Sequence, residues 1–180
     1  PSIQPFKLKT MSQTQPGPAS TLDKLENLRV SETIPLISPA NLHAQLPLSQ
    51  RAAQTVSSGR RAVESVLTGE SEQFLALVGP CSIHDPKAAL EYGEKLLALQ
   101  NEIGDEVLLV MRVYFEKPRT VIGWKGLIND PHLDGSYDMA TGLFRARKLL
   151  LQLSEMGIFC ATEFLDSIAP QYIADLITWA

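Results

Sequence analysis

The chain has 180 residues, 44% of them hydrophobic, and a formal net charge of −4. These values are typical of one globular domain and argue against a nucleic-acid partner. No apolar run approaches the roughly 18 residues that cross a bilayer, and no secretory signal pattern opens the chain, so no membrane partner is predicted. Two cysteines are too few for a disulfide scaffold, which favours a cytoplasmic location.

The first part of the chain is predicted to be a tail followed by an arm. Residues 1–20 are rich in Pro, Gln, Ser and Thr, so they are predicted to be disordered. Residues 21–72 are predicted to contact the protein body or another subunit. Prolines limit Leu22–Leu48 to an extended arm with short helical pieces, and one apolar face predicts a helix over Ser49–Leu67.

Residues 73–180 alternate strand and helix patterns. The predicted strands are Phe74–Val78, Val107–Tyr114 and Ile158–Thr162, and the first is expected to be covered on both faces. One helix is predicted to begin at Asp85 and Pro86, as N-cap and first helical residue, and to bury a stripe of Ala89, Tyr92, Leu96 and Leu99. Further helices are predicted over Asp138–Met156, with Gly157 as C-cap and Leu143, Ala146, Leu150 and Leu153 inward, and from Pro170 to Trp179.

Three βα units in a row predict a parallel α/β sheet with right-handed crossovers. An open doubly wound sheet and a shortened (β/α)8 barrel both fit this pattern. No GxGxxG or GxxxxGK[ST] follows the first strand, which weakens the nucleotide-binding versions of the open sheet. A barrel needs about 250 residues, and Ile177–Ala180 is interpreted as part of an uncapped helix. We therefore expect part of a longer protein, with an exposed edge strand that makes it prone to aggregate.

Polar side chains that could bind a ligand or act in catalysis lie at the end of each predicted strand. Arg112, Lys117 and Arg119 lie within eight residues at the end of the second strand, which suits a phosphate ester, although a solvated basic loop is the alternative. Cys81 follows the first strand, and Glu163 follows the third as either a buried partner of a cation or an exposed carboxylate. The carboxyl ends of parallel strands share one face, where active sites form.

Three roles suit Cys81: nucleophile, metal ligand or small buried filler. Cys81-x-x-His84 is half of a zinc pattern without a second pair. Cys160 is predicted to be structural, and two strand spacings of about 10 Å would prevent a disulfide between the two cysteines. The long connection 116–137 is predicted to be a lid or binding loop, and His132 within it, like His43, is expected to be solvated or locally hydrogen-bonded.

Four blocks together resemble class I 3-deoxy-D-arabino-heptulosonate-7-phosphate (DAHP) synthases, in matching order and at compatible spacing. They are Gly79–His84, Arg112–Thr120, Gly123–Gly126 and Glu163–Asp166. The resemblance implies a (β/α)8 TIM barrel with an N-terminal extension, here truncated to about its first three βα units. It also implies the condensation of phosphoenolpyruvate with erythrose 4-phosphate, the first step of the shikimate pathway.

The resemblance also implies residue roles. Cys81 looks like a ligand of a divalent metal, with Mn, Fe, Co and Zn all compatible. Arg112 and Lys117 look like phosphoenolpyruvate-site cations, with Lys117 between the two substrates. Arg119 and Thr120 resemble the clamp on the phosphate of erythrose 4-phosphate.

Further residues carry weaker implications. Glu163 looks like part of the phosphoenolpyruvate pocket. Asn27 and Arg29 resemble an arm that pairs with a neighbouring subunit, and Pro170 and Gln171 resemble the pocket of an aromatic amino acid inhibitor. These imply a homo-oligomer with such an effector, while an arm packed on its own barrel is the alternative.

The family's other three metal ligands lie on later strands, so residues 1–180 alone are expected to be inactive. Two rival functions stand beside this interpretation. One is a related enzyme, the eight-carbon keto-octulosonate phosphate synthase. The other is a non-catalytic regulatory module that oligomerises through its arm and binds an aromatic amino acid.

Overall fold

The computed structural model describes residues 28–30, 32–118 and 122–180. The chain divides into two compact units, Pro1–Pro35 and Leu36–Ala180. The described residues of the first unit form no helix or strand. The predicted disorder of residues 1–20 lies outside the described residues.

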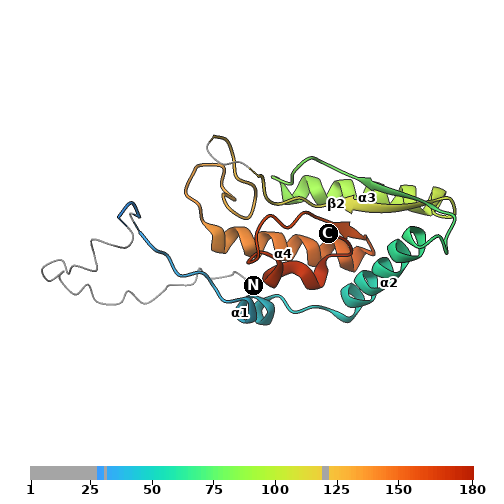
Figure 1. Ribbon diagram of the computed structural model, residues 1–180, viewed down its shortest axis with the longest axis horizontal. Helices are drawn as coiled ribbons and strands as arrows, with labels where there is room; N and C mark the ends of the chain where they lie inside the picture. The colour runs from blue at the N-terminus through green and yellow to red at the C-terminus, as the bar shows by residue number, and fades with distance from the viewer. Residues whose placement is uncertain (1–27, 31, 119–121) are drawn as a thin grey trace, which may run out of the picture. The chain divides into compact units, whose positions relative to one another are not determined.

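The second unit contains every helix and strand of the described residues (Figure 1). In chain order they are α1 (Pro39–Gln45), α2 (Gln50–Leu67), β1 (Phe74–Val78), α3 (Pro86–Ile103), β2 (Val107–Arg112), α4 (Met139–Met156), β3 (Cys160–Ala161), α5 (Pro170–Ile173) and the 3-10 turn η2 (Ala174–Leu176). The order confirms the alternation predicted for the second half of the chain and the helix predicted over Ser49–Leu67.

The three strands form one parallel sheet in the order β1-β2-β3. Phe74 lies opposite Val107 in β2, and Met111 lies opposite Cys160 in β3. The sheet confirms the parallel α/β class, while the described strands form a small sheet and not a barrel. Because β2 lies between β1 and β3, the two cysteines are separated by a strand, and neither is in a disulfide.

Helices pack on both faces of β2. Leu109 and Met111 belong to the main core, which α3 and α4 complete. Leu108 and Val110 point the other way and pack with Val63 of α2. The alternation follows from the two-residue period of a strand, and it places α2 on the opposite side of the sheet from α3.

The prediction that β1 is covered on both faces is wrong for this chain. Phe74 is 71% exposed and Leu77 is 41% exposed. The reason is topological, because β1 is the edge strand and pairs only with β2 in the sheet. An exposed apolar edge of this kind is a site where chains associate.

Helix ends follow the predicted local signals. The Asp85 carboxylate accepts a hydrogen bond of 2.8 Å from the Lys87 amide, and Pro86 is the first residue of α3. Asp138 caps α4 through the Thr141 amide, at 3.1 Å. Gly157 ends α4 with φ of 96°, a left-handed conformation that favours glycine.

The buried stripe of α3 differs from the prediction. Ala89 and Leu96 are buried as expected, but Tyr92 is 36% exposed and Leu99 41% exposed. Gly93 takes the inward position instead. A Cβ there would lie 2.7 Å from Ile158 Cδ1, so a larger residue would require the Ile158 and Leu153 side chains to shift. In α4 the predicted inward residues Leu143, Ala146, Leu150 and Leu153 are all buried.

Three predicted boundaries are also wrong. The second strand ends at Arg112 and not at Tyr114, and the third spans only Cys160–Ala161. The helix predicted from Pro170 to Trp179 ends at Ile173 and is followed by η2. Beyond η2 the chain is extended, and Trp179 forms a parallel bridge with Ala161. The β-branched pair before Trp179 suits this extended conformation.

Three arginines attach the outer helices to the body through backbone carbonyl groups. Arg51 and Arg60 of α2 donate to the Glu155 carbonyl and to the Ile177 carbonyl, the latter at 2.8 Å. Arg147 of α4 donates to the Leu46 carbonyl at the end of α1, at 2.8 Å. Carbonyl groups at helix ends lack hydrogen-bond donors within their own helix, and these arginine side chains act as the donors instead.

Candidate active site at the strand ends

The candidate site lies where β1 and β2 end. Gly79 follows β1 with φ of 148°, and a Cβ there would lie 3.0 Å from the Arg112 carbonyl oxygen. The next residues are attached to the chain beyond β2, because the Ile83 amide donates to the Tyr114 carbonyl at 2.8 Å and the Ser82 hydroxyl donates to it at 3.2 Å. The loop that carries Cys81 is therefore held against the end of β2.

Two of the predicted site residues are in direct contact. The Lys117 ammonium donates to the Cys81 sulfur at 3.1 Å. Cys81 is exposed, and Lys117 is half-buried. The backbone of Lys117 is also fixed, since its amide donates to the Lys125 carbonyl at 3.0 Å. Residues 36 positions apart thus meet at the shared carboxyl end of the sheet.

Arg112 is the last residue of β2 and is half-buried. Its guanidinium carbon lies 4.2 Å from the centroid of the Tyr114 ring, a cation–π distance. Its Nε atom is buried and has no hydrogen-bond partner within the described part of the chain. A buried N–H group of this kind needs an acceptor, and an anionic ligand would supply one. Arg119 and Thr120 lie outside the described residues.

The long connection after β2 is partly a packed element. Leu127 and Ile128 are fully buried. The indole of Trp124 donates to the Asp130 carbonyl at 2.7 Å, and the Asp130 carboxylate accepts from the Gly135 amide at 3.2 Å. These contacts give Trp124 and Asp130 structural roles.

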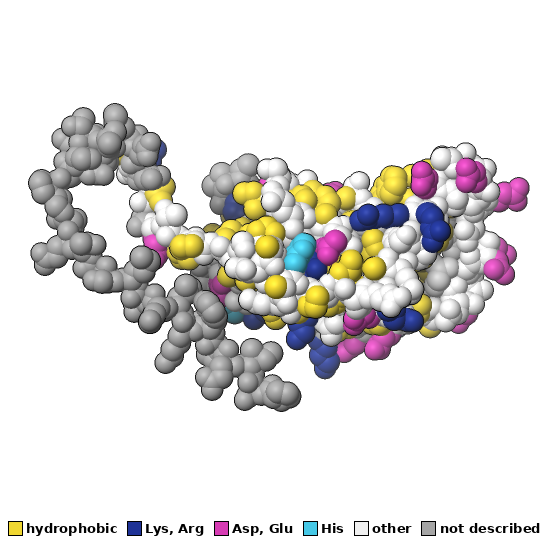
Figure 2. Space-filling view, turned by 90° about the horizontal axis from the view of Figure 1, so that it is seen from below, with side chains coloured by type: hydrophobic (Ala, Val, Ile, Leu, Met, Phe, Trp, Pro, Cys, Tyr) yellow, Lys and Arg dark blue, Asp and Glu magenta, His cyan; other side chains and the backbone are white. Residues whose placement is uncertain are grey.

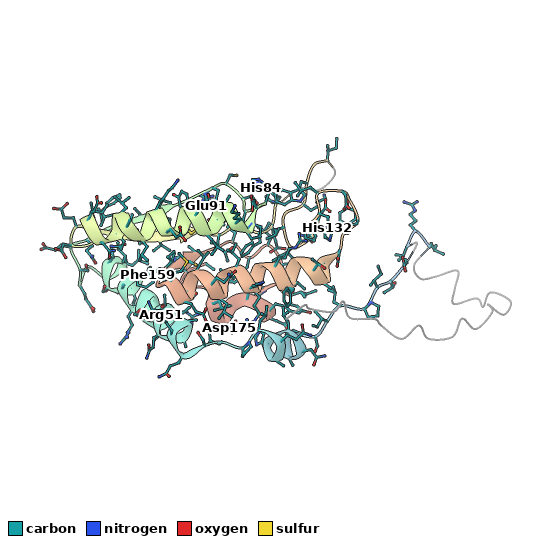
Figure 3. All side chains as sticks on the ribbon, turned by 180° about the vertical axis from the view of Figure 1, so that it is seen from behind. Arg51, His84, Glu91, His132, Phe159 and Asp175 are labelled. Carbon is teal, nitrogen blue, oxygen red and sulfur yellow. The ribbon has the colours of Figure 1, made fainter. Side chains whose placement is uncertain are left out.

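Both histidines that were expected to be solvated or locally bonded have partners. His132 lies 3.4 Å from the Asp138 carboxylate, a local contact. His43 lies 3.2 Å from the Tyr172 carbonyl, which is 129 residues away. Figure 3 shows His84 and His132, from the loops after β1 and β2, toward the same end of the unit and away from Phe159.

Three carboxylates lie near the site: Glu163 and Asp166 are exposed, and Glu116 is half-buried. Glu116, next to Lys117, interacts with Asp166 from the loop after β3. Burial and the negative charge of Asp166 raise the pKa of Glu116 to about 7. The Asp166 carboxylate accepts two backbone hydrogen bonds of 2.7 Å, from the amides of Ile168 and Ala169, which fix its position.

Sequence reasoning did not select Glu116. An acidic residue directly before Lys117, at a strand end, is the signal that could have identified it. Its pKa depends on how deeply the side chain is buried and on Asp166, which is 50 positions away, so the shift itself needed the tertiary structure.

Glu116 should make stability depend on pH. An acid whose pKa rises from 4.5 to about 7 on folding binds more protons in the folded state between these values. The free energy of unfolding should therefore fall as pH rises from 4.5 to 7, by on the order of 1 kcal/mol after allowance for solvent screening. Urea unfolding across this range should show a smaller decline for Glu116→Gln, with the exposed Glu91→Gln as control. Equal pH profiles for all three proteins would contradict the assignment.

The residues implied in regulation are dispersed over the chain. Arg29 lies in the first unit, and Asn27 lies outside the described residues. Pro170 begins α5, and the Gln171 side chain donates to the Ser167 carbonyl at 3.3 Å.

The side chains near Cys81 can be compared with those that a divalent metal ion requires. A cysteine thiolate suits borderline and soft divalent ions, so Cys81 fits one coordination position. Among residues 28–30, 32–118 and 122–180, no group of three or more His, Cys, Asp or Glu side chains could hold a metal ion. The described residues therefore supply one ligand and not a complete site.

The surface is consistent with a small anionic ligand. Figure 2 shows Lys and Arg interspersed with Asp and Glu on the face that it displays, without a continuous basic surface. No helix within the described ranges is long and apolar enough to cross a membrane. The fold and the strand-end residues define a parallel α/β protein with a thiol and cations gathered at the carboxyl ends of its strands.

Comparison with known proteins identifies the family. The model of the DAHP synthetase I family matches residues 45–180, and this chain belongs to that family. It is 52% identical over 154 residues to the Phe-sensitive phospho-2-dehydro-3-deoxyheptonate aldolase of Escherichia coli K12, covering 86% of this chain and 44% of that protein. It is 50% identical to the corresponding aldolase of Amycolatopsis methanolica, covering 91% of this chain and 80% of that protein.

A solved structure agrees. The phospho-2-dehydro-3-deoxyheptonate aldolase of Francisella tularensis SCHU S4 superposes with a TM-score of 0.81 at 49% identity, covering 83% of this chain and 44% of that one. Trp-sensitive and Tyr-sensitive aldolases are similar as well, at 51% and 49% identity. The chain spans 44% of the length of the E. coli Phe-sensitive relative.

Proposed function

We propose that this protein condenses phosphoenolpyruvate with erythrose 4-phosphate and water to give DAHP and phosphate. The contact of 3.1 Å between Lys117 and Cys81 is the observation that carries the proposal. It joins a cation that can bind an anionic substrate to a thiol that can bind a metal. Membership of the DAHP synthetase I family supports the same reaction.

The cations are proposed to bind and orient the substrates. Arg112 would donate to phosphoenolpyruvate through its unpartnered Nε atom, and Lys117 would lie between the two substrates, holding a proton at Nζ. Arg119 and Thr120 would bind the phosphate of erythrose 4-phosphate, and Glu163 would line the phosphoenolpyruvate pocket. Fixed donors of this kind stabilise two phosphates held close together and favour the geometry of reaction.

The bond changes follow from the substrates. C3 of phosphoenolpyruvate attacks the aldehyde carbon, water adds at C2, and phosphate leaves by cleavage of its C–O bond. A divalent ion held in part by Cys81 would supply Lewis-acid polarisation of the aldehyde. Since the described residues provide one such ligand, we propose that residues 1–180 by themselves do not turn over.

The wider architecture is part of the proposal. The three parallel strands and the extended segment at Trp179 would belong to a (β/α)8 barrel, in which residues 73–180 form the first part. Residues 21–72 would be its N-terminal extension, with residues 1–20 as a tail. The names of the Phe-, Trp- and Tyr-sensitive relatives support an aromatic amino acid effector, acting on a homo-oligomer through Asn27, Arg29, Pro170 and Gln171.

The substrate assignment can be tested directly. The full-length protein, supplied with a divalent metal, should consume phosphoenolpyruvate in the presence of erythrose 4-phosphate and form a seven-carbon sugar phosphate. Arabinose 5-phosphate, the five-carbon alternative, should give at least about 100-fold lower kcat/KM, because a misplaced phosphate loses its binding contacts. Product identity can be determined by mass spectrometry. A higher rate with the five-carbon aldose would favour the eight-carbon synthase, and no consumption with either would contradict the proposal.

A further inference from the structure

The contact between Cys81 and Lys117 brings a thiol and an amine to within 3.1 Å of each other. The backbone near each partner is fixed by a hydrogen bond. The Ile83 amide donates to the Tyr114 carbonyl, and the Lys117 amide donates to the Lys125 carbonyl. These backbone hydrogen bonds therefore keep the loops after β1 and β2, and with them the Cys81 sulfur and the Lys117 amine, close together. Cys81 is also exposed, so a small oxidant can reach its sulfur.

The second cysteine cannot take part in the same chemistry. Cys160 is fully buried, and its burial raises the pKa of its thiol to about 12. The strand β2 lies between its strand and β1, so a disulfide with Cys81 would need the sheet to open. Of the two cysteines in these 180 residues, Cys160 is therefore out of reach of an oxidised Cys81, while the Lys117 amine lies beside it.

We propose that Cys81 and Lys117 form a covalent sulfur–nitrogen cross-link, a sulfenamide, when the folded protein meets hydrogen peroxide. A cation beside a cysteine is one of the surroundings in which thiols react with oxidants. Sulfenic acids are known to condense with protein nitrogen atoms. The cross-link is independent of the proposed condensation reaction, because it rests only on the contact and on the exposure of the sulfur.

The reaction has two steps. The Cys81 thiolate attacks one oxygen of hydrogen peroxide, the O–O bond breaks, and the departing hydroxide takes a proton from the Lys117 ammonium and becomes water. The sulfur is oxidised by two electrons to sulfenic acid, and the peroxide is reduced. The neutral amine then attacks this sulfur, the S–N bond forms, and the S–OH bond breaks as the hydroxide leaves with the second amine proton as water.

The cross-link would remove two groups from the site together. Lys117 would lose its positive charge, and Cys81 would lose the lone pairs and charge that suit a metal. A thiol reductant reverses the change, because it attacks the sulfur and releases the amine. The pair would thus act as a reversible modification site.

Peptide mass spectrometry of the folded protein, treated with dilute hydrogen peroxide and then digested, tests the proposal. The expected product is a linked pair of peptides that contain Cys81 and Lys117, lighter by about 2 Da than their sum. Dithiothreitol should restore both peptides. The protein unfolded in urea before oxidation should give at least about tenfold less of the linked pair, because the effective concentration of the amine is lost.

Matched variants separate the contact from general reactivity. Lys117→Arg should stop at the sulfenic acid, detected as a dimedone adduct on Cys81. Lys87→Arg, which alters an exposed lysine of α3, and Cys160→Ser should leave the cross-link unchanged. The proposal is overturned if oxidised Cys81 appears without a link to Lys117 in the folded protein, or if the urea-unfolded protein links equally well.

Discussion

Replacing Lys117 by alanine is expected to lower kcat/KM of the full-length enzyme by about 100- to 1,000-fold. The Lys117 ammonium contacts the Cys81 sulfur at 3.1 Å, near the buried Arg112 Nε atom, which has no hydrogen-bond partner among the described residues. In its proposed role Lys117 donates to substrate phosphate, so its removal takes away one fixed cationic donor. Steady-state kinetics with both substrates varied would measure the loss, and the fall should appear in kcat as well as in KM.

The fold should survive this change, because Lys117 is only half-buried and its backbone contact with Lys125 remains. Lys87→Ala is the matched control. Lys87 is 86% exposed on α3 and has one weak ion pair with Glu91, at 3.9 Å, so its activity should stay within about twofold of the unmodified enzyme. Activity of Lys117→Ala close to that of Lys87→Ala would contradict the proposed role.

Replacing Arg147 by alanine is expected to lower the free energy of unfolding by about 3–5 kcal/mol. Arg147 is fully buried in α4. Its guanidinium donates to both carboxylate oxygens of Asp175, at 2.7 and 2.9 Å, and to the carbonyls of Leu46 and Tyr172, both at 2.8 Å. The variant removes these four hydrogen bonds and leaves the Asp175 carboxylate without its cation, while the Tyr172 carbonyl keeps its contact with His43.

The ion pair with Arg147 changes the pKa of the half-buried Asp175 carboxyl. Burial pushes its pKa up, but the hydrogen bonds and positive charge of Arg147 outweigh this effect and hold the pKa below its usual range. Without Arg147 the carboxylate loses this support. Figure 3 shows Asp175 beside the helices that the ion pair joins.

Urea unfolding at pH 7 would measure the cost of Arg147→Ala. Arg145→Ala is a control from the same helix, since Arg145 makes one backbone hydrogen bond, of 2.7 Å to the Pro131 carbonyl. It should cost about 1 kcal/mol. Asp175→Asn, which keeps the shape of the acceptor but not its charge, should fall between the two. Equal losses for Arg147→Ala and Arg145→Ala would show that the buried network contributes no more than one ordinary hydrogen bond.

Short sequence patterns were sufficient to predict features that depend on interactions between residues close together in the chain. Asp85 with Pro86 begins α3, and Gly157 ends α4, because capping depends on residues within one turn of the helix. The alternation of elements predicted a parallel sheet, and a parallel sheet places strand ends on one face. This was enough to predict that Cys81 and Lys117 lie at the same face of the sheet.

Local signals failed where a distant segment decides the conformation. Leu99 fits a helical stripe, but α3 packs with Gly93 inward against Ile158, and Leu99 is exposed. Trp179 follows a pattern that fits a helix, yet it is extended because Ala161 offers a parallel partner. The spacing of apolar residues cannot predict whether Leu99 is buried or whether Trp179 is extended, since it contains no information on which distant segment packs against them.

The amino-acid sequence by itself determined the parallel α/β class, the caps of the main helices, and the placement of Cys81 and Lys117 at one face of the sheet, since each depends on short spacing or on strand direction. Only the tertiary structure decided the burial of Arg147 with Asp175, the raised pKa of Glu116 beside Asp166 and the exposed edge of β1. The physical reason is that burial, and the charge interactions it strengthens, depend on segments that the chain brings together from far apart.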